Sequence, residues 1–94
     1  MRPAARHDLA KIWTYTADTW GAFQADSYVR EINDRVIKLL DFPAMGSRVE
    51  GLPEQYRKVR SGSHRVIYRT TEVELLVVRI IHEREDVPDD IETW

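Results

Sequence analysis

The 94-residue sequence predicts an α+β fold, with an N-terminal helical hairpin packed on a small antiparallel β-sheet. Two observations lead to this prediction. Apolar residues recur every three or four positions over residues 9–40, whereas they alternate with a period of two after residue 55. The length, with 43% hydrophobic and 32% charged residues, fits one domain over residues 1–94. We therefore expect two helices followed by three strands.

The first helix is expected from about Pro3 to Thr19. Proline suits a first helical turn because its missing N–H would have no partner there, and Gly21 can end the helix with a positive φ angle. The helix should bury a single stripe of residues spaced three or four apart. These are Leu9, Ile12, Trp13, Thr16 and Trp20.

The second helix repeats this spacing and should end before Phe42 and Pro43, because a proline disfavours helical backbone in the residue before it. Its expected buried positions are Ala25, Tyr28, Val29, Ile32, Val36, Leu39 and Leu40. Only a short break at Trp20 and Gly21 separates the two helices, so they should form an antiparallel hairpin.

Residues 43–55 contain two prolines and two glycines without a sustained period, and we expect a connecting loop there. Three antiparallel strands should follow in a meander, over residues 56–60, 64–69 and 73–82. In the last strand both alternating sets are apolar, as in a strand covered on both faces. Since two helices cover one face, the other is expected to present an apolar groove rimmed by arginines. That groove is either an interface or an overestimate of burial.

The composition excludes several classes of protein. The absence of cysteine rules out disulfides, thiolate metal sites and a cysteine nucleophile, and it favours the cytoplasm. The longest aliphatic run, residues 75–78, is far shorter than the roughly 20 residues of a membrane span, and the basic N-terminus lacks the apolar segment of a secretory signal. The three histidines, His7, His64 and His82, lack metal-ligand spacing. We expect a cytoplasmic protein with no metal and no cofactor.

Charge is segregated along the chain although the net charge is only −2. Residues 56–82 carry six basic and two acidic side chains, a net of +4, whereas residues 83–94 carry one basic and six acidic side chains, a net of −5. The acidic tail is therefore able to screen the basic block. The alternative interpretation is that both segments are solvated surface.

Four aromatic residues of the two expected helices lie at helical spacing. They are Trp13, Tyr15, Trp20 and Tyr28. This spacing favours packing in the core and at the corner of the hairpin over a platform on which nucleobases stack. We expect them to be core residues.

Several short motifs have a distinctive order. The N-terminal half contains Asp8-Leu9, the corner Trp20-Gly21 and then Gln24-Ala25. The C-terminal half contains Val-Ile-Tyr-Arg at 66–69 and the run 77–86, which ends in His-Glu-Arg-Glu-Asp. Together, and nearly from end to end, these motifs resemble the ParE branch of the RelE/ParE superfamily of bacterial toxins. The resemblance implies a helical hairpin on an antiparallel sheet, a cognate ParD-like antitoxin, and inhibition of DNA gyrase.

Two features depart from the family pattern. The usual first strand is missing, since only Met1 and Arg2 precede Pro3, and Glu85 stands where an apolar residue is common. A sheet edge left open in this way invites pairing with another chain. A homo-oligomer formed through this edge is therefore one expectation.

We expect a toxin of a type II toxin–antitoxin system that acts by binding and is not an enzyme. The candidate residues for contacts with target and antitoxin are Arg57, Arg65, Arg69, Arg79, His82 and Arg84. One alternative is a ribosome-dependent mRNA endoribonuclease of the RelE type, using Arg65, Arg79 and His82, although no tyrosine follows Tyr68. A second alternative is an inactive toxin relic that still binds antitoxin.

Overall fold

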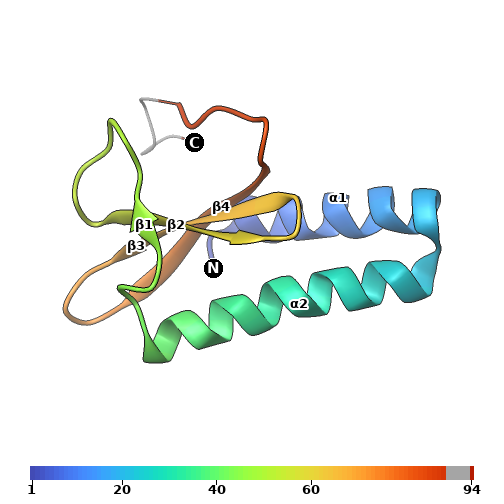
Figure 1. Cartoon of the computed structure of the whole chain (residues 1–94), viewed down its shortest axis with the longest axis horizontal. Helices are drawn as coiled ribbons and strands as arrows, with labels where there is room; N and C mark the ends of the chain where they lie inside the picture. Colours follow the sequence, from blue (N-terminus) through green and yellow to red (C-terminus); the bar gives the residue numbers. More distant parts are fainter. Residues whose placement is uncertain (89–93) are drawn as a thin grey trace.

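The computed structural model describes residues 1–88 and residue 94 of the chain (Figure 1). Two helices come first, α1 (Pro3–Trp20) and α2 (Ala22–Asp41). Four strands follow: β1 (Ser47–Arg48), β2 (Tyr56–Ser61), β3 (His64–Thr70) and β4 (Leu75–His82). The strands form one antiparallel sheet in the order β1-β2-β3-β4. The predicted α+β fold, the helical hairpin and the meander of the last three strands are confirmed.

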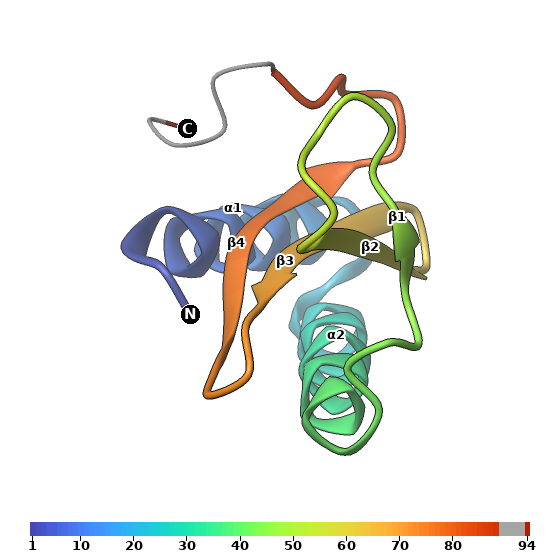
Figure 2. The same cartoon turned by 90° about the vertical axis from the view of Figure 1, so that its left-hand side faces the viewer.

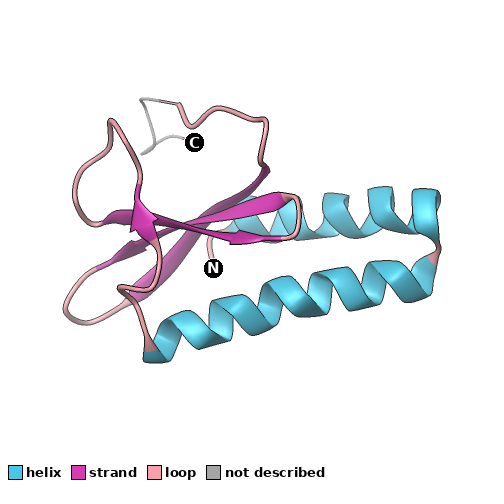
Figure 3. Cartoon of the chain, viewed as in Figure 1, coloured by secondary structure: helices cyan, strands magenta, loops and turns pink. Residues whose placement is uncertain are grey.

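The helices lie on one side of the sheet, as Figures 2 and 3 show from two directions. A single residue, Gly21, joins them with a φ angle of 96°, a backbone conformation that strains any residue with a Cβ atom. The first core cluster lies between the helices and the inner face of the sheet, and it contains Ala5, Ile12, Ile32, Val66, Val77 and Ile80. Within the described residues, neither helix is both long and apolar enough to cross a membrane.

The expectation of a plain loop over residues 43–55 is wrong for Ser47 and Arg48, which form β1 against β2. A tyrosine hydroxyl holds this segment to the sheet. The Gly46 N–H donates to Tyr68 Oη (2.9 Å), and the Tyr68 hydroxyl donates to the Pro43 carbonyl oxygen (2.8 Å). A Cβ atom on Gly46 would lie 2.4 Å from that hydroxyl oxygen, so only glycine fits. Burial, the largest effect, raises the pKa of Tyr68.

The open apolar groove expected on the outer face of the sheet is also absent from the described part of the chain. A second cluster covers that face and contains Val49, Tyr56, Ile67, Val78 and Ile81, with Leu52, Val87 and Trp94 packed against it. Ile67 and Val78 are both 0% exposed because the loop after β1 and the C-terminal residues lie over them. Trp94 thus packs on the body of the protein. Ile91, another apolar residue of the acidic tail that is able to pack there, lies outside the described residues.

A bulge in β4 makes both faces of that strand apolar. Tyr68 pairs with Val77 and Ile67 pairs with Arg79, so Val78 is an extra residue in the ladder. The bulge moves Ile80 to the helix-facing cluster and leaves Ile81 on the outer face. Simple alternation along residues 75–80 places Ile80 with Leu76 and Val78, on the face opposite Val77. That assignment is wrong, since Ile80 and Val77 share the helix-facing cluster.

The edge of β4, where the missing first strand was expected to leave the sheet open, is partly covered by the N-terminal part of this chain. The Arg2 N–H donates to the Val77 carbonyl oxygen (3.0 Å). Further along the chain, within α1, Asp8 Oδ2 accepts the Ile80 N–H (2.9 Å). The same carboxylate accepts two hydrogen bonds from the Arg79 guanidinium, at 2.7 and 2.9 Å.

Several residues that were expected to be buried are exposed. Trp20 is 73% exposed and Tyr15 70%, so the core interpretation of these rings is wrong; Trp13 (37%) and Leu40 (65%) are also exposed. Figure 1 shows the reason for the rings near the corner: both helices extend beyond the end of the sheet, where no strand lies against them. Tyr28, by contrast, is partly buried.

We expect Asp8→Ala to lower the free energy of unfolding by about 3–5 kcal/mol, because it leaves the Arg79 guanidinium and a strand N–H without their partner. The Asp8 side chain is only 8% exposed, so water cannot easily replace it. Urea unfolding followed by circular dichroism measures the change. The matched control is Asp18→Ala, an exposed acidic residue of the same helix, which should shift stability by less than about 0.5 kcal/mol. Equal unfolding midpoints for the two variants would contradict the structural role of Asp8.

Candidate partner-binding surface

Basic side chains gather on the outer face of β2 and β3. Arg60 pairs directly with Arg65, and Lys58 pairs with Ile67, a residue of the outer cluster. Residues directly opposite one another in a sheet share a face, so all three cations lie on the outer side. With Arg84 from the turn after β4, they line a hollow of about 450 Å³ whose other walls are Ser47 and Glu83. We call Lys58, Arg60, Arg65 and Arg84 the basic surface.

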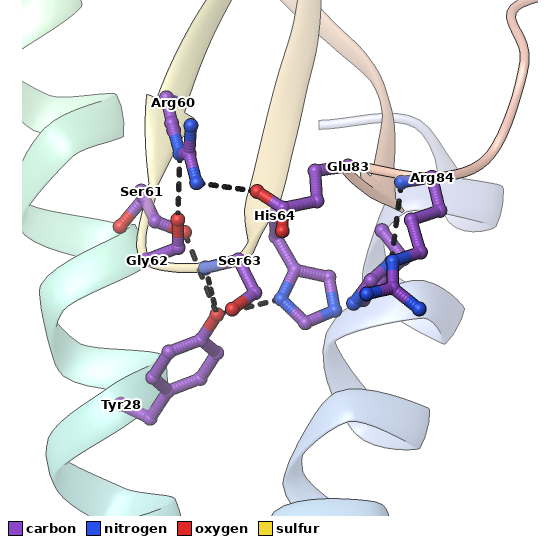
Figure 4. A network of polar contacts seen from close by, with 9 residues as sticks. Tyr28, Arg60, Ser61, Gly62, Ser63, His64, Glu83 and Arg84 are labelled. Atoms are coloured by element: carbon purple, nitrogen blue, oxygen red, sulfur yellow. Dashed lines mark hydrogen bonds and ion pairs between the residues drawn. The ribbon is translucent and has the colours of Figure 1, made fainter.

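The positive charge of this surface is only partly compensated. Glu83 forms an ion pair with Arg60, the residue just before the Ser61–His64 turn (Figure 4). Arg65 donates from Nη2 to the Glu85 carbonyl oxygen, while its buried Nε has no hydrogen-bond partner among the described residues. Four basic side chains and one acidic side chain therefore face the same hollow. Such a surface attracts carboxylates or phosphates.

Two of the six candidate residues, Arg65 and Arg84, belong to the basic surface. The sequence interpretation did not select Lys58 and Arg60 as site residues. The signal that identifies them is their spacing of two within β2, which puts both on the face opposite Arg57 and Val59.

The other four candidates lie elsewhere. Arg57 donates from Nη1 to the Gly46 carbonyl oxygen (2.7 Å) and so supports the segment before β1. Arg69 pairs with Tyr56 and Leu76, near the opposite end of the sheet from the Ser61–His64 turn. Arg79 is held by Asp8 and belongs to β4, which β2 and β3 separate from the edge strand β1. His82 is the last residue of β4, and its ring meets the His64 ring edge to face.

Arg79 is already occupied by contacts within the chain. Hydrogen bonding to Asp8 is the main effect that raises its pKa, and the ring of Trp94 lies 4.6 Å from its guanidinium carbon. Arg79 and His82 both border a small hollow of about 100 Å³, but Arg65 is not among the residues that line it. The three residues considered for RNA cleavage therefore do not converge on one hollow.

A second polar cluster joins α2 to the ends of β3 and β4 (Figure 4). Tyr28 Oη lies 2.6 Å from His64 Nδ1 and accepts the Ser63 N–H at 2.9 Å. The His64 ring meets the His82 ring edge to face, with centroids 5.4 Å apart. Gly62, at a φ angle of 58°, leaves room for Tyr28, because a Cβ atom there would lie 2.6 Å from the tyrosine ring.

Comparison with known proteins identifies the family. Residues 1–87 match the family model described as "ParE toxin of type II toxin-antitoxin system, parDE". This chain belongs to the ParE toxin family. Toxin ParE1 of Mycobacterium tuberculosis (strain CDC 1551 / Oshkosh) is 39% identical over 88 residues, which cover 93% of this chain and 90% of that protein. Toxin ParE1 of Caulobacter vibrioides (strain ATCC 19089 / CIP 103742 / CB 15) is 39% identical over 79 residues, 84% of this chain and 81% of that protein.

A solved structure supports the ParE fold independently. The structure described as "Chromosomal ParDE TA system from P. aeruginosa" superimposes with a TM-score of 0.73, covering 86% of this chain and 89% of that chain. The two sequences are only 19% identical, so this similarity concerns the fold alone. The expected family is confirmed, and the chain is a ParE-type toxin of a type II toxin–antitoxin system.

The polar cluster of Tyr28, His64 and His82 makes the stability of this ParE toxin depend on pH. Burial, and then the nearby His82, lower the pKa of His64 below its ordinary value of 6.5. The unfolded chain therefore takes up a proton at His64 more readily than the folded chain does. The stability due to neutral His64 is complete above pH 6.5 and is lost as the pH falls through the lowered pKa.

We expect the urea midpoint to fall between about pH 7 and pH 5, and His64→Asn to reduce this dependence because it removes the titrating group. The matched variant His7→Asn, at an exposed position of α1, should keep the full dependence. Equal pH profiles for His64→Asn and the parent chain would exclude His64 as the source.

Proposed function

We propose that this ParE toxin inhibits DNA gyrase by binding it, and that a ParD-like antitoxin neutralises the toxin by covering the same area. The observation that carries the proposal is the basic surface, where Lys58, Arg60, Arg65 and Arg84 face one hollow beside a single carboxylate. Gyrase, a protein that acts on DNA, presents both carboxylates and DNA phosphates to such a surface. Occlusion by the antitoxin needs no separate regulatory site.

Arginine suits an acidic protein partner because its planar guanidinium forms paired hydrogen bonds with a carboxylate. The matching family is described as a toxin of a type II toxin-antitoxin system, parDE, and an antitoxin is therefore the protein partner that we propose. An antitoxin segment that is disordered when free would fold as it binds. We infer that this segment is acidic and lies along the outer side of β2 and β3.

The positions of the candidate catalytic groups favour binding over RNA cleavage. Cleavage of RNA requires a base for the 2′-hydroxyl and an acid for the leaving oxygen, both within reach of one phosphate. Arg79 is paired with Asp8, and Arg65 does not line the hollow that Arg79 shares with His82. These facts support a toxin that is not an enzyme.

Antitoxin binding can be tested by co-expressing the toxin with the product of the neighbouring gene. We expect a complex that co-purifies, and a double variant Lys58→Ala/Arg84→Ala that weakens it by about tenfold, equivalent to about 1.4 kcal/mol. The control is Arg30→Ala/Lys38→Ala, which removes the same charge from exposed positions of α2. Equal weakening by both pairs would exclude the basic surface, and separate elution of the two wild-type proteins would exclude the partner.

Gyrase inhibition can be tested with purified gyrase and antitoxin-free toxin, scoring both supercoiling and trapped cleaved DNA. Inhibition should weaken as salt is added, because exposed charges are screened. Arg84→Ala should reduce inhibition, whereas Lys11→Ala, at an exposed position of α1, should have little effect. If a large excess of folded toxin changes neither readout, gyrase is not the target and the inactive-relic alternative gains support.

The nuclease alternative has its own test, because RNA cleavage is detected directly on free and ribosome-bound messenger RNA. We expect no cleavage with the wild-type toxin. Cleavage that disappears in His82→Ala but persists in His7→Ala would show that the toxin is a nuclease and would overturn the binding mechanism.

A further inference from the structure

The same end of the molecule has a second hollow, apart from the basic surface. A pocket of about 510 Å³ lies on the other side of the Ser61–His64 turn, between the extending part of the helical hairpin and the sheet. It is lined by Tyr15, Thr16, Trp20, Gln24, Tyr28, Ser63, His64 and His82. Its volume lies within the range of about 300–1,000 Å³ that is usual for pockets that bind small molecules.

Two of the aromatic rings that line this pocket are not explained by packing in the core. Trp20 and Tyr15 are 73% and 70% exposed, and neither belongs to the buried residues of either core cluster. Large exposed rings at the mouth of a pocket are suited to stack on another planar ring. They are two of the four aromatic residues for which a base-stacking role was the alternative to core packing.

The opposite end of the pocket presents hydrogen-bond donors. His82 Nδ1 accepts the Arg84 N–H at 3.2 Å, so the proton of a neutral His82 is on Nε2. Tyr28 Oη accepts the Ser63 N–H, and it lies 2.6 Å from His64 Nδ1 but 3.5 Å from its other possible acceptor, the Ser61 carbonyl oxygen. The shorter contact favours donation of the hydroxyl proton to His64 Nδ1, which places the proton of a neutral His64 on Nε2 as well. Among residues 1–88 and 94, no hydrogen-bond partner is assigned to either Nε2 atom.

The charge around the pocket determines what kind of ring fits. None of the eight lining residues is acidic. Arg84 lies two residues after His82, to which its backbone N–H donates, and its side chain belongs to the basic surface on the far side of the turn. Aromatic walls, N–H donors and an adjacent cationic area suit a planar ring that carries hydrogen-bond acceptors and is attached to a phosphate.

We propose that this pocket binds an unpaired nucleobase, which stacks on Trp20 and Tyr15, accepts hydrogen bonds from His64 and His82, and directs its phosphate toward Arg84. The ligand is a nucleotide, either free or as part of a single strand. This site is separate from the contacts proposed for the antitoxin, except for Arg84, which the two share.

The probes are AMP, UMP and a five-nucleotide single-stranded DNA, titrated into the antitoxin-free toxin by calorimetry and by NMR of the histidine rings. We expect binding by at least one probe, with shifts at His64 and His82 but not at the exposed His7. Tighter binding of the oligonucleotide than of the mononucleotides would identify single-stranded nucleic acid as the source. The reverse order would identify a free nucleotide.

Variants in the pocket and a control outside it test whether the nucleotide binds in the pocket or elsewhere on the surface. Trp20→Leu and Tyr15→Ser change exposed side chains that the core does not need, so both variants should fold, and each should weaken binding by at least tenfold. Phe23→Leu is the matched control, because this ring is 86% exposed near the same corner but does not line the pocket. It should change affinity by less than twofold.

Three outcomes would overturn the proposal. One is the absence of binding by all three probes at millimolar concentration. Another is equal binding of ribose 5-phosphate and AMP, which would show that only the phosphate is recognised. The third is binding of a tryptophan-containing peptide but of no nucleotide, which would indicate a protein partner. Because supercoiling is assayed separately, failure here leaves the gyrase proposal intact.

Discussion

The carboxylate of Asp8 is the interaction on which the arrangement of helices and sheet depends. It is nearly buried, and it accepts three hydrogen bonds from β4: two from the Arg79 guanidinium and one from the Ile80 N–H. A strand at the edge of a sheet has polar groups that need partners, and α1 supplies one of them from a side chain. This contact sets the position of α1 against β4, and therefore the position of the whole hairpin over the sheet.

Once the hairpin is held in this way, the two ends of the molecule differ. Near the start of α1 the helices lie against the sheet and bury aliphatic residues. Near Gly21 the helices extend beyond the sheet. The pocket at that end is bounded by Tyr28, His64 and His82, which are held together by a polar contact and a ring contact. The basic surface and the pocket lined by Tyr15 and Trp20 both border the Ser61–His64 turn, where the chain reverses direction between β2 and β3.

Each of the two apolar clusters stabilises one face of this small sheet. The helices cover the inner face, and the loop after β1 with Val87 and Trp94 covers the outer face. The outer face of the sheet is therefore apolar where Val87 and Trp94 cover it, and it is basic beside these residues. A partner that approaches the basic surface meets Arg60 and Arg84, which are exposed, whereas Arg79 is confined between Asp8 and Trp94.

The sequence by itself determined the fold class, the bounds of both helices to within a few residues, the last three strands and the family. Local periodicity carries this information, since each pattern reports only its own element. Tertiary structure alone decided what covers each element. Periodicity placed Trp20 in a buried stripe, but it is exposed because the helix extends beyond the sheet there. Alternation placed Ile80 on the wrong face, because a bulge at Val78 shifts the pairing of β4 with β3. The basic surface likewise needed strand pairing to bring Arg84 next to Lys58, because contacts between distant segments depend on register and packing, which no local pattern contains.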